Sequence, residues 1–347
     1  MSTVKPFDFF IQWHLTEKCN LSCRHCYQGE RSTDEMPLSD IRKVAAEAAE
    51  MVSAWSDDYG VDFSRSMNIT GGEPLLRRDL YAVLDAIKKE GFDCYLLTNG
   101  TLVTKDAAQA FADLGLKGIQ VSVEGPEHVH ESIRGKGSLA ASAAGIEHLV
   151  EARLPVTINV TLSGLNASSM KHIVDFAVRM GATRVGFSRL VPAGRGRTMI
   201  SNMLSPDEVR ELYQSILAEG VWPIEIVTGD PVASQLGKPL NGDCGSVAVS
   251  GCSAGVSGLT ILPNGDVTPC RRLPLCLGNV RSDSLRELWA ASPILEALRD
   301  RSRYRGQCGT CSRWAHCRGC RAIAYAWSVS NGRPDFLGDD PQCFMHA

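Results

Sequence analysis

The chain has 347 residues, of which 44% are hydrophobic and 22% charged, and its formal net charge is -3 at pH 7. These values are ordinary for a globular protein with one large and one smaller domain, and the near-neutral charge gives no sequence-wide electrostatic argument for nucleic-acid binding. The amino terminus lacks a signal-peptide pattern and no apolar run reaches the roughly 18 residues that span a bilayer, so we expect a cytoplasmic protein without membrane contact.

Apolar runs alternate with helical periodicity along the first 220 residues. Six runs predict strands, at residues 9–15, 66–70, 94–98, 119–123, 156–162 and 184–191. Amphipathic segments between them predict helices, and Ser39, Thr104 and Ser205 stand where helix N-caps are expected. Six strand-helix units in alternation imply a parallel sheet with right-handed crossovers, either in a doubly wound fold or in a barrel.

The first strand leads into a loop that carries Cys19, Cys23 and Cys26. Thirteen cysteines in a chain expected in the cytoplasm indicate metal or redox chemistry rather than a disulfide framework. Three thiolates on one loop can hold an iron-sulfur cluster or, with His14 or His25 as a fourth ligand, a zinc ion. With only three protein ligands, a cubane cluster keeps one iron open for a substrate or cofactor.

Eight further candidate residues follow or end predicted strands. They are Gly71, Gly72, Glu73, Pro74, Asn99, Ser122, Glu124 and Leu190. The two glycines can let the backbone approach a ligand without side-chain interference, although a Gly-Gly turn before a helix is equally ordinary. Turn chemistry at a strand end is likewise an alternative to ligand contact for the polar residues of this set.

The cysteine spacing and the Gly-Gly-Glu-Pro motif together resemble the signature of the radical S-adenosylmethionine (radical SAM) superfamily. The resemblance covers about residues 9–220 and implies an α/β fold, a partial (β/α)6 TIM-type barrel with its ligands at the carboxyl ends of the strands. It implies that Cys19, Cys23 and Cys26 hold a [4Fe-4S] cluster whose open iron binds S-adenosylmethionine. Reductive cleavage of that cofactor then yields a 5'-deoxyadenosyl radical, which abstracts a hydrogen atom from the substrate.

The same resemblance implies roles for the strand-end residues. The backbone carbonyls of residues 71–74 and the carboxylate of Glu73 would receive the methionine amino group of the cofactor. Ser122 and Glu124 would contact its ribose, and Asn99 would help to bind it. The segment that includes Leu190 would contact adenine or carboxylate.

Nine of the thirteen cysteines lie between residues 244 and 343, and this crowding sets the predicted domain boundary. We expect the barrel at residues 1–220 and a cysteine-rich domain at residues 221–347. Taken alone, the paired motifs at residues 308–311 and 317–320 predict a zinc ribbon. Pro-Asn-Gly-Asp at residues 263–266 predicts a hairpin turn.

The full series of cysteines resembles the SPASM domain, an extension of radical SAM enzymes that holds two auxiliary [4Fe-4S] clusters. By position, the resemblance implies an inner cluster on Cys244, Cys252, Cys270 and Cys320 and an outer cluster on Cys308, Cys311, Cys317 and Cys343. The chain departs from the usual pattern because two residues rather than three separate Cys317 from Cys320. Arg271 follows Cys270 where sulfatase-maturing relatives carry an acidic base, which argues against sulfatase maturation.

Two cysteines have no place in these sets. We expect Cys94 to be a buried strand thiol that acts as a small hydrophobe. Cys276 lies near the presumed cluster ligands, and we assign it no role. Among the other titratable residues, His128 and His130 follow the fourth predicted strand, and we expect both to face solvent.

The combined resemblance implies a radical SAM/SPASM oxidoreductase or maturase that modifies a ribosomally made peptide or protein, by crosslinking or by side-chain oxidation. Residues 277–280 and 320–343 also resemble the haem-biosynthesis branch, which alters propionate side chains, so a tetrapyrrole enzyme is the alternative. A zinc-ribbon binding module without catalysis is the alternative of another class. We expect a reductant such as flavodoxin or ferredoxin and, because no fused leader-binding domain is expected before the barrel, either direct docking of the peptide or a separate peptide-recognition protein.

Overall fold

The structure is a computed structural model that describes residues 7–29, 33–218, 220–236 and 247–345. Within these ranges ten strands form one sheet, in the order β10-β9-β8-β1-β2-β3-β4-β5-β6-β7. The strands are β1 (Phe7–His14), β2 (Phe63–Thr70), β3 (Asp93–Thr98), β4 (Gly118–Ser122), β5 (Val156–Leu162), β6 (Arg184–Arg189), β7 (Glu225–Thr228), β8 (Gly258–Ile261), β9 (Asp266–Thr268) and β10 (Gly278–Asn279). Strands β8 and β1 to β7 pair in parallel, whereas β9 and β10 are antiparallel additions at one edge.

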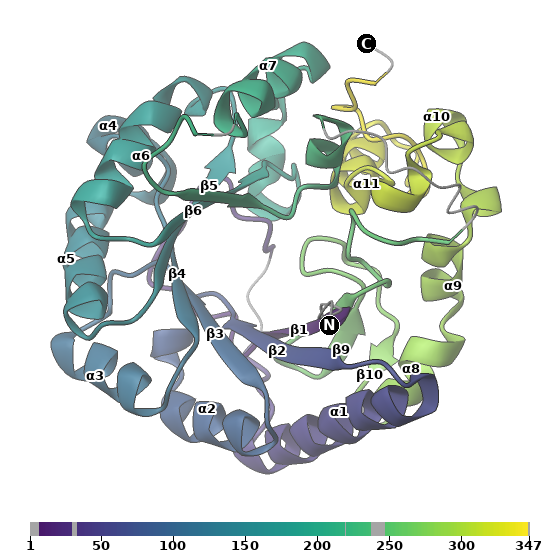
Figure 1. The fold of residues 1–347 in the computed structure, drawn as a ribbon, viewed down its shortest axis with the longest axis horizontal. Helices are drawn as coiled ribbons and strands as arrows, with labels where there is room; N and C mark the ends of the chain where they lie inside the picture. The colour runs from purple at the N-terminus through teal and green to yellow at the C-terminus, as the bar shows by residue number, and fades with distance from the viewer. Residues whose placement is uncertain (1–6, 30–32, 219, 237–246, 346–347) are drawn as a thin grey trace.

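Helices cover the outer side of this curved sheet (Figure 1). They are α1 (Leu38–Tyr59), α2 (Leu80–Lys89), α3 (Lys105–Asp113), α4 (Glu127–Arg134), α5 (Ser138–Glu151), α6 (Met170–Arg179), α7 (Pro206–Ile216), α8 (Leu285–Ala291), α9 (Pro293–Arg299), α10 (Gly306–Thr310) and α11 (Arg321–Ser330). Figure 1 shows α1 to α7 around the sheet and the later helices across the remaining gap, so the predicted partial barrel is confirmed. No helix in the described ranges is long and apolar enough to cross a bilayer.

The six predicted strands correspond to β1 through β6, each shifted by three residues or fewer at its ends. Two predicted caps are confirmed: the hydroxyl of Thr104 accepts a hydrogen bond from the Ala107 amide (3.2 Å), and Ser205 forms a capping box with Glu208. The cap predicted at Ser39 is wrong. The carbonyl of Pro37 already accepts the first helical amide bonds, so α1 begins at Leu38 and Ser39 lies inside its first turn.

The sheet continues across the predicted domain boundary. Strand β7 pairs with β6, and β8 pairs with β1, so both flanks of the barrel are extended by residues after 220. Phe9 of β1 also packs edge-on against Trp55 and against Trp289 of α8, with ring centroids 5.0 and 5.1 Å apart. The boundary at residue 220 therefore does not separate two independent sheets or cores.

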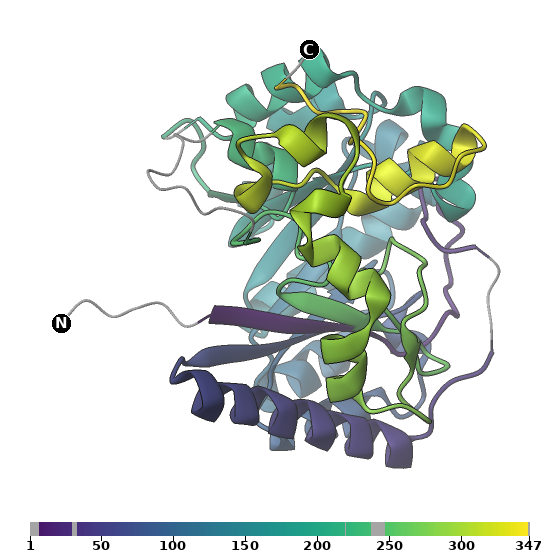
Figure 2. The same ribbon diagram turned by 90° about the vertical axis from the view of Figure 1, so that its right-hand side faces the viewer.

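The predicted hairpin turn between β8 and β9 is confirmed. Gly265 has a φ of 94°, a left-handed conformation that favours glycine, and its amide donates to the Leu262 carbonyl (2.9 Å). After this hairpin the chain crosses to the β6 side of the barrel, where α11 lies beside the segment that follows β6 (Figures 1 and 2). There the side-chain amide of Gln342 donates to the Leu204 carbonyl (2.7 Å), which anchors the carboxyl-terminal segment to the barrel.

Candidate active site

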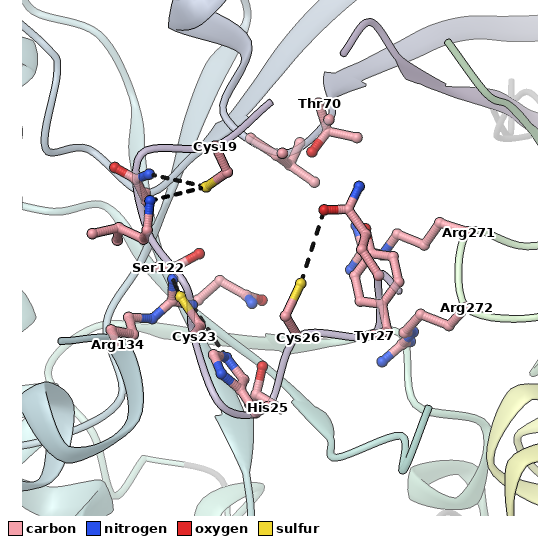
Figure 3. A pocket seen from close by; sticks show the side chains of 18 of the residues that line it. Cys19, Cys23, His25, Cys26, Tyr27, Thr70, Ser122, Arg134, Arg271 and Arg272 are labelled. Carbon is pink, nitrogen blue, oxygen red and sulfur yellow. Dashed lines mark hydrogen bonds between the residues drawn. The ribbon is translucent and has the colours of Figure 1, made fainter. Parts of the chain in front are cut away.

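An open cavity lies at the carboxyl ends of the parallel strands. The strand register aligns these ends: His14 pairs with Thr70, and Ser122 pairs with Asn159. Polar residues from five strands therefore reach one space, as expected for the functional face of an α/β barrel. Figure 3 shows this cavity, with the amino-terminal cysteine loop on one side and Arg271 and Arg272 on the other.

Cys19, Cys23 and Cys26 all line the cavity. The Leu21 amide donates to the Cys19 sulfur (3.4 Å), and the Arg134 guanidinium donates to the Cys23 sulfur (3.8 Å). Hydrogen-bond donors and a positive charge favour thiolates, which are the ligand form that metal clusters need. In the described part of the chain no group of three Cys, His, Asp or Glu side chains is arranged to hold a single metal ion, but these three thiols do face one cavity. This donor set fits an iron-sulfur cluster.

The electrostatics of the loop are dominated by burial and by Arg134. Burial raises the pKa of the Cys23 thiol from its usual value, and the charge of Arg134 opposes that rise. Arg134 is itself held by Glu124, whose carboxylate it contacts through Nη2 (2.6 Å) and Nε (2.9 Å). The guanidinium is therefore fixed in place before any ligand binds.

The Gly-Gly turn packs against the cysteine loop. The Gly72 amide donates to the Thr16 carbonyl (2.7 Å), and the Glu73 amide donates to the Lys18 carbonyl (2.7 Å). A β-carbon on Gly72 would collide with the Lys18 carbonyl oxygen and lie 2.7 Å from that of Glu17. Gly71 and Gly72 do line the cavity, but the close approach that demands glycine at residue 72 is to the loop backbone and not to a ligand.

Glu73 is fully buried and does not line the cavity. Its carboxylate accepts hydrogen bonds from the Thr98 hydroxyl (2.7 Å) and the Asn99 amide (2.8 Å). Burial raises the pKa of Glu73, and these two donors oppose the rise. In this structure Glu73 ties the Gly-Gly turn to the end of β3 instead of facing the cavity, and Pro74 is likewise buried behind it.

Glu124 also points away from the cavity into a buried network. Besides Arg134, it contacts His25 Nε2 (3.1 Å) and accepts from the Thr161 amide (2.9 Å). Burial alone would raise the pKa of Glu124, but the charges of Arg134 and His25 hold it well below its usual value. The carboxylate therefore orients Arg134 and His25 beside the cysteines. No motif in the sequence indicated a residue with this role.

The histidines after β4 differ from each other. His128 is exposed as predicted, but His130 is fully buried, so the prediction that both face solvent is wrong. His130 Nδ1 accepts a hydrogen bond from the Glu124 amide (3.2 Å), and burial lowers its pKa to about 4. The segment after β4 forms the short helix α4, which turns one histidine inward, and no strand pattern signalled that helix.

Two of the other predicted cofactor contacts reach the cavity and one does not. Ser122 and Asn99 line it, and the Asn99 side chain donates to Asn20 of the cysteine loop (2.9 Å). Leu190 is buried in the interior, while its neighbours Ser188 and Arg189 line the cavity.

Four of the carboxyl-terminal cysteines surround a second, small cavity. They are Cys308, Cys311, Cys317 and Cys343. The Gln235 side-chain amide bridges two of them, donating to the sulfurs of Cys317 (3.4 Å) and Cys343 (3.4 Å). Cys320 does not line this cavity, so the four cysteines of a simple zinc ribbon are not gathered around one space.

Cys320 lies instead with the cysteines of the preceding hairpin. It belongs to a small buried cluster against which Cys270 packs, and it interacts electrostatically with Cys252 and with Arg272. Its amide donates to the carboxylate of Asp340 (2.8 Å). Cys244 falls outside the described residues.

The two unassigned cysteines lie apart from these groups. Cys94 is completely buried in β3, where burial raises its pKa to about 12, which confirms the prediction of a structural strand thiol. Cys276 is exposed, and its sulfur donates only a long hydrogen bond to the Gly278 carbonyl (3.6 Å).

Two protein-family models match the chain. The Radical SAM superfamily matches residues 13–177, and an iron-sulfur cluster-binding domain named SPASM matches residues 252–321. Among similar proteins, an AdoMet-dependent heme synthase of Nitratidesulfovibrio vulgaris is 30% identical over 96% of this chain and 91% of its own. The mycofactocin maturase MftC of Mycobacterium tuberculosis is 29% identical over 96% of this chain and 82% of its own.

Solved structures with the same fold include Streptococcus suis SuiB bound to its precursor peptide SuiA. That chain superimposes with a TM-score of 0.75 at 19% identity, and the match covers 97% of this chain and 76% of SuiB. The likeness includes both the barrel and the cysteine-rich part, and at this identity it is a likeness of fold.

Proposed function

This chain belongs to the radical SAM superfamily, and from that premise we propose that it modifies a ribosomally made peptide or protein. It is an enzyme with a SPASM extension, and its cofactors are S-adenosylmethionine and [4Fe-4S] clusters. The modification we propose is a crosslink or the oxidation of a side chain. A non-catalytic zinc-ribbon module is no longer an alternative, because the zinc-ribbon pattern lies in a chain that carries both matched domains.

The observation that carries the catalytic part is the single cavity that Cys19, Cys23 and Cys26 share with the strand ends. We assign the catalytic cluster to these three thiols. When bound, the cluster and S-adenosylmethionine supply reductive cleavage and radical hydrogen abstraction. Asn99 and Ser122 offer polar side chains to the cofactor from the same cavity wall.

The other residues of the first site act through their neighbours. Glu73 fixes the end of β3, and Glu124 fixes Arg134 against Cys23. Gly71 and Gly72 hold the cysteine loop against β2 and present their backbone to the cavity. A preformed loop of this kind lowers the cost of ordering ligands when the cluster and cofactor bind.

We assign two auxiliary clusters to the cysteine-rich part, for three clusters in the chain. The outer assignment is supported by the shared cavity of Cys308, Cys311, Cys317 and Cys343. The inner assignment, to Cys244, Cys252, Cys270 and Cys320, is supported by the packing of Cys270 against the buried cluster that contains Cys320, and by the electrostatic interaction of Cys320 with Cys252. We retain residues 1–220 and 221–347 as the two functional domains, although one sheet runs through both.

The peptide substrate is supported by the similarity to a maturase along nearly the whole chain. We also propose that a reductant such as flavodoxin or ferredoxin and a separate peptide-recognition protein act with this enzyme, and that it is located in the cytoplasm. The second candidate is a tetrapyrrole enzyme that alters propionate side chains. It is favoured by one observation, the 30% identity to an AdoMet-dependent heme synthase over 96% of this chain.

The test is a turnover assay on anaerobically purified protein with reconstituted clusters. About twelve irons per chain, with 5'-deoxyadenosine formed after reduction by dithionite, are expected for three clusters and a competent first site. Peptides encoded beside the gene and propionate-bearing tetrapyrroles are then offered separately, and products are identified by mass spectrometry. A mass change in a peptide supports the first candidate, a change in a tetrapyrrole supports the second, and a protein that forms no 5'-deoxyadenosine refutes the assignment of the catalytic site.

A further inference from the structure

Two adjacent arginines from the SPASM part form one wall of the barrel cavity. Arg271 and Arg272 occupy the middle of a tight turn in which the Leu273 amide donates to the Cys270 carbonyl (2.9 Å). This turn directs both side chains into the cavity, and Figure 3 shows them opposite Cys19 and Ser122, with Tyr27 between. The two positive charges therefore face the space in which a substrate must sit if the cluster is bound by the cysteine loop.

Neither arginine forms an ion pair with a carboxylate in the described part of the chain. Buried and half-buried charges are normally paired, because an unpaired charge loses hydration without compensation. Two other cavity arginines obey the rule, since Arg134 is paired with Glu124 and Arg189 with two aspartates, and a third, Arg195, donates to the Cys23 carbonyl (3.1 Å). The charges of Arg271 and Arg272 thus lack the carboxylate partners that Arg134 and Arg189 have.

The environments of the two arginines differ. Within the described ranges, Arg272 makes only long hydrogen bonds, to the Ser188 hydroxyl (3.4 Å) and the Arg189 carbonyl (3.5 Å), and its buried Nε has no partner there. It also interacts electrostatically with the thiols of Cys320 and Cys270, so a cluster on those cysteines would balance part of its charge. Arg271 packs its guanidinium 5.8 Å from the ring centre of Tyr27 and has no hydrogen-bond acceptor among the described residues.

We propose that Arg271, supported by Arg272, binds a carboxylate group of the substrate. The planar guanidinium presents paired N–H donors that match the two oxygens of a carboxylate, and its position over the Tyr27 ring, 5.8 Å from the ring centre, adds a cation–π attraction. Because Tyr27 follows Cys26 directly, a carboxylate held there places the adjoining part of the substrate beside the catalytic cysteine loop. This inference rests on the proposed function, and it adds that the substrate is an organic acid bound through its anionic group.

Both proposed substrates contain such a group. A peptide has its terminal and side-chain carboxylates, and a tetrapyrrole has its propionates. The source is therefore decided by matched probes: a short synthetic peptide with a free carboxyl terminus against its amide, and a porphyrin with propionic acid side chains against its methyl ester. Each of the four probes is titrated against cluster-loaded wild-type protein and against the variants Arg271→Gln and Arg271→Lys, and its affinity is measured by fluorescence.

In the wild type, we expect one acid probe to bind more tightly than its neutral derivative. Arg271→Gln should weaken the binding of that acid probe by about 10- to 100-fold, which is the effect of losing a charged hydrogen-bonded pair. The neutral derivative should bind as before. Arg271→Lys keeps the charge but loses the paired donors and should give an intermediate affinity. Unchanged binding of the neutral derivative shows that each variant is folded.

Arg305→Gln is the matched control, because Arg305 is exposed and pairs with Asp335 at the surface. It should leave all affinities unchanged. The proposal is overturned if no acid probe is preferred over its neutral form in the wild type. It is also overturned if Arg271→Gln weakens the binding of S-adenosylmethionine to the same extent as the acid probe, because Arg271 would then hold the carboxylate of the cofactor. Failure of the proposed function is a separate result, an absence of 5'-deoxyadenosine from the wild type.

Discussion

Arg189→Met is expected to destabilise the joint between the barrel and the carboxyl-terminal segment. Arg189 ends β6 and contacts Asp230 through two nitrogens (2.7 and 2.9 Å) and Asp340 through two (3.0 and 2.8 Å). The exposed fractions of the three side chains are 0%, 3% and 0%. Loss of the guanidinium leaves two buried carboxylates without their cation, which costs about 3–5 kcal/mol for a broken buried pair.

The effect should reach the cysteine-rich part. Asp340 also accepts the amide of Cys320 (2.8 Å), so its displacement should move that cysteine. We therefore expect Arg189→Met to lower the urea midpoint and to change the EPR signal of the auxiliary cluster on Cys320. Midpoints are compared at equal iron content, because proteins with bound metal seldom unfold in two states.

Arg184→Met is the matched control in the same strand. Arg184 pairs with Glu225 at 2.6 Å, but both side chains are about half exposed (51% and 57%), and an exposed pair contributes only about 0–1 kcal/mol. Replacing Asp230 and Asp340 by asparagine together with Arg189→Met should restore part of the loss, because no buried charge then remains unpaired. If Arg189→Met and Arg184→Met lower the midpoint equally, the buried ion network does not hold the two parts together.

Three further predictions concern the clusters. Replacing the three cysteines of the amino-terminal loop by alanine should abolish 5'-deoxyadenosine formation, while the auxiliary clusters persist in the Mössbauer spectrum. The control Cys276→Ala, which changes an exposed thiol, should keep both the activity and the clusters. Formation of 5'-deoxyadenosine at the wild-type rate in the triple variant would contradict the catalytic assignment. The valine side chain of Gly72→Val should clash with the Lys18 carbonyl and push the cysteine loop away. We therefore expect a lower affinity for S-adenosylmethionine, measured by calorimetry, and a lower iron content. If neither value changes, the loop can adjust to the side chain. Cys320→Ala and Cys343→Ala should remove the EPR signals of different auxiliary clusters, and loss of the same signal in both would favour a single ribbon centre.

The sequence by itself determined the elements and the ligand types. Local apolar runs located the strands, and the cysteine spacings indicated chemistry that needs thiolates on one loop. The alternation of units determined that the carboxyl ends of the strands meet, which is why the cysteine loop, Gly72 and Ser122 lie at one cavity. Each of these inferences depends on residues that are close in the chain or repeated with a fixed period.

The direction of individual side chains was decided only by tertiary structure. Glu73 and Glu124 follow strands as ligand-binding residues would, yet their carboxylates turn to Asn99, 26 positions further along the chain, and to Arg134, ten positions further. His130 faces inward because α4 packs that face against Glu124. The pairing of β2 with β3 brings Asn99 to Glu73, and the short helix α4 brings His130 and Arg134 to Glu124, so these directions follow from how the elements pack and not from the strand pattern.

The joining of the two parts was likewise a tertiary result. The composition shift near residue 220 was real, but β8 hydrogen-bonds to β1, and Arg189 reaches Asp340 across 151 positions of sequence. The sequence located Arg271 only as the neighbour of a cysteine. Its place in the cavity wall depends on the hairpin after β8 crossing the open side of the barrel, because only that crossing brings a carboxyl-terminal turn within reach of Tyr27.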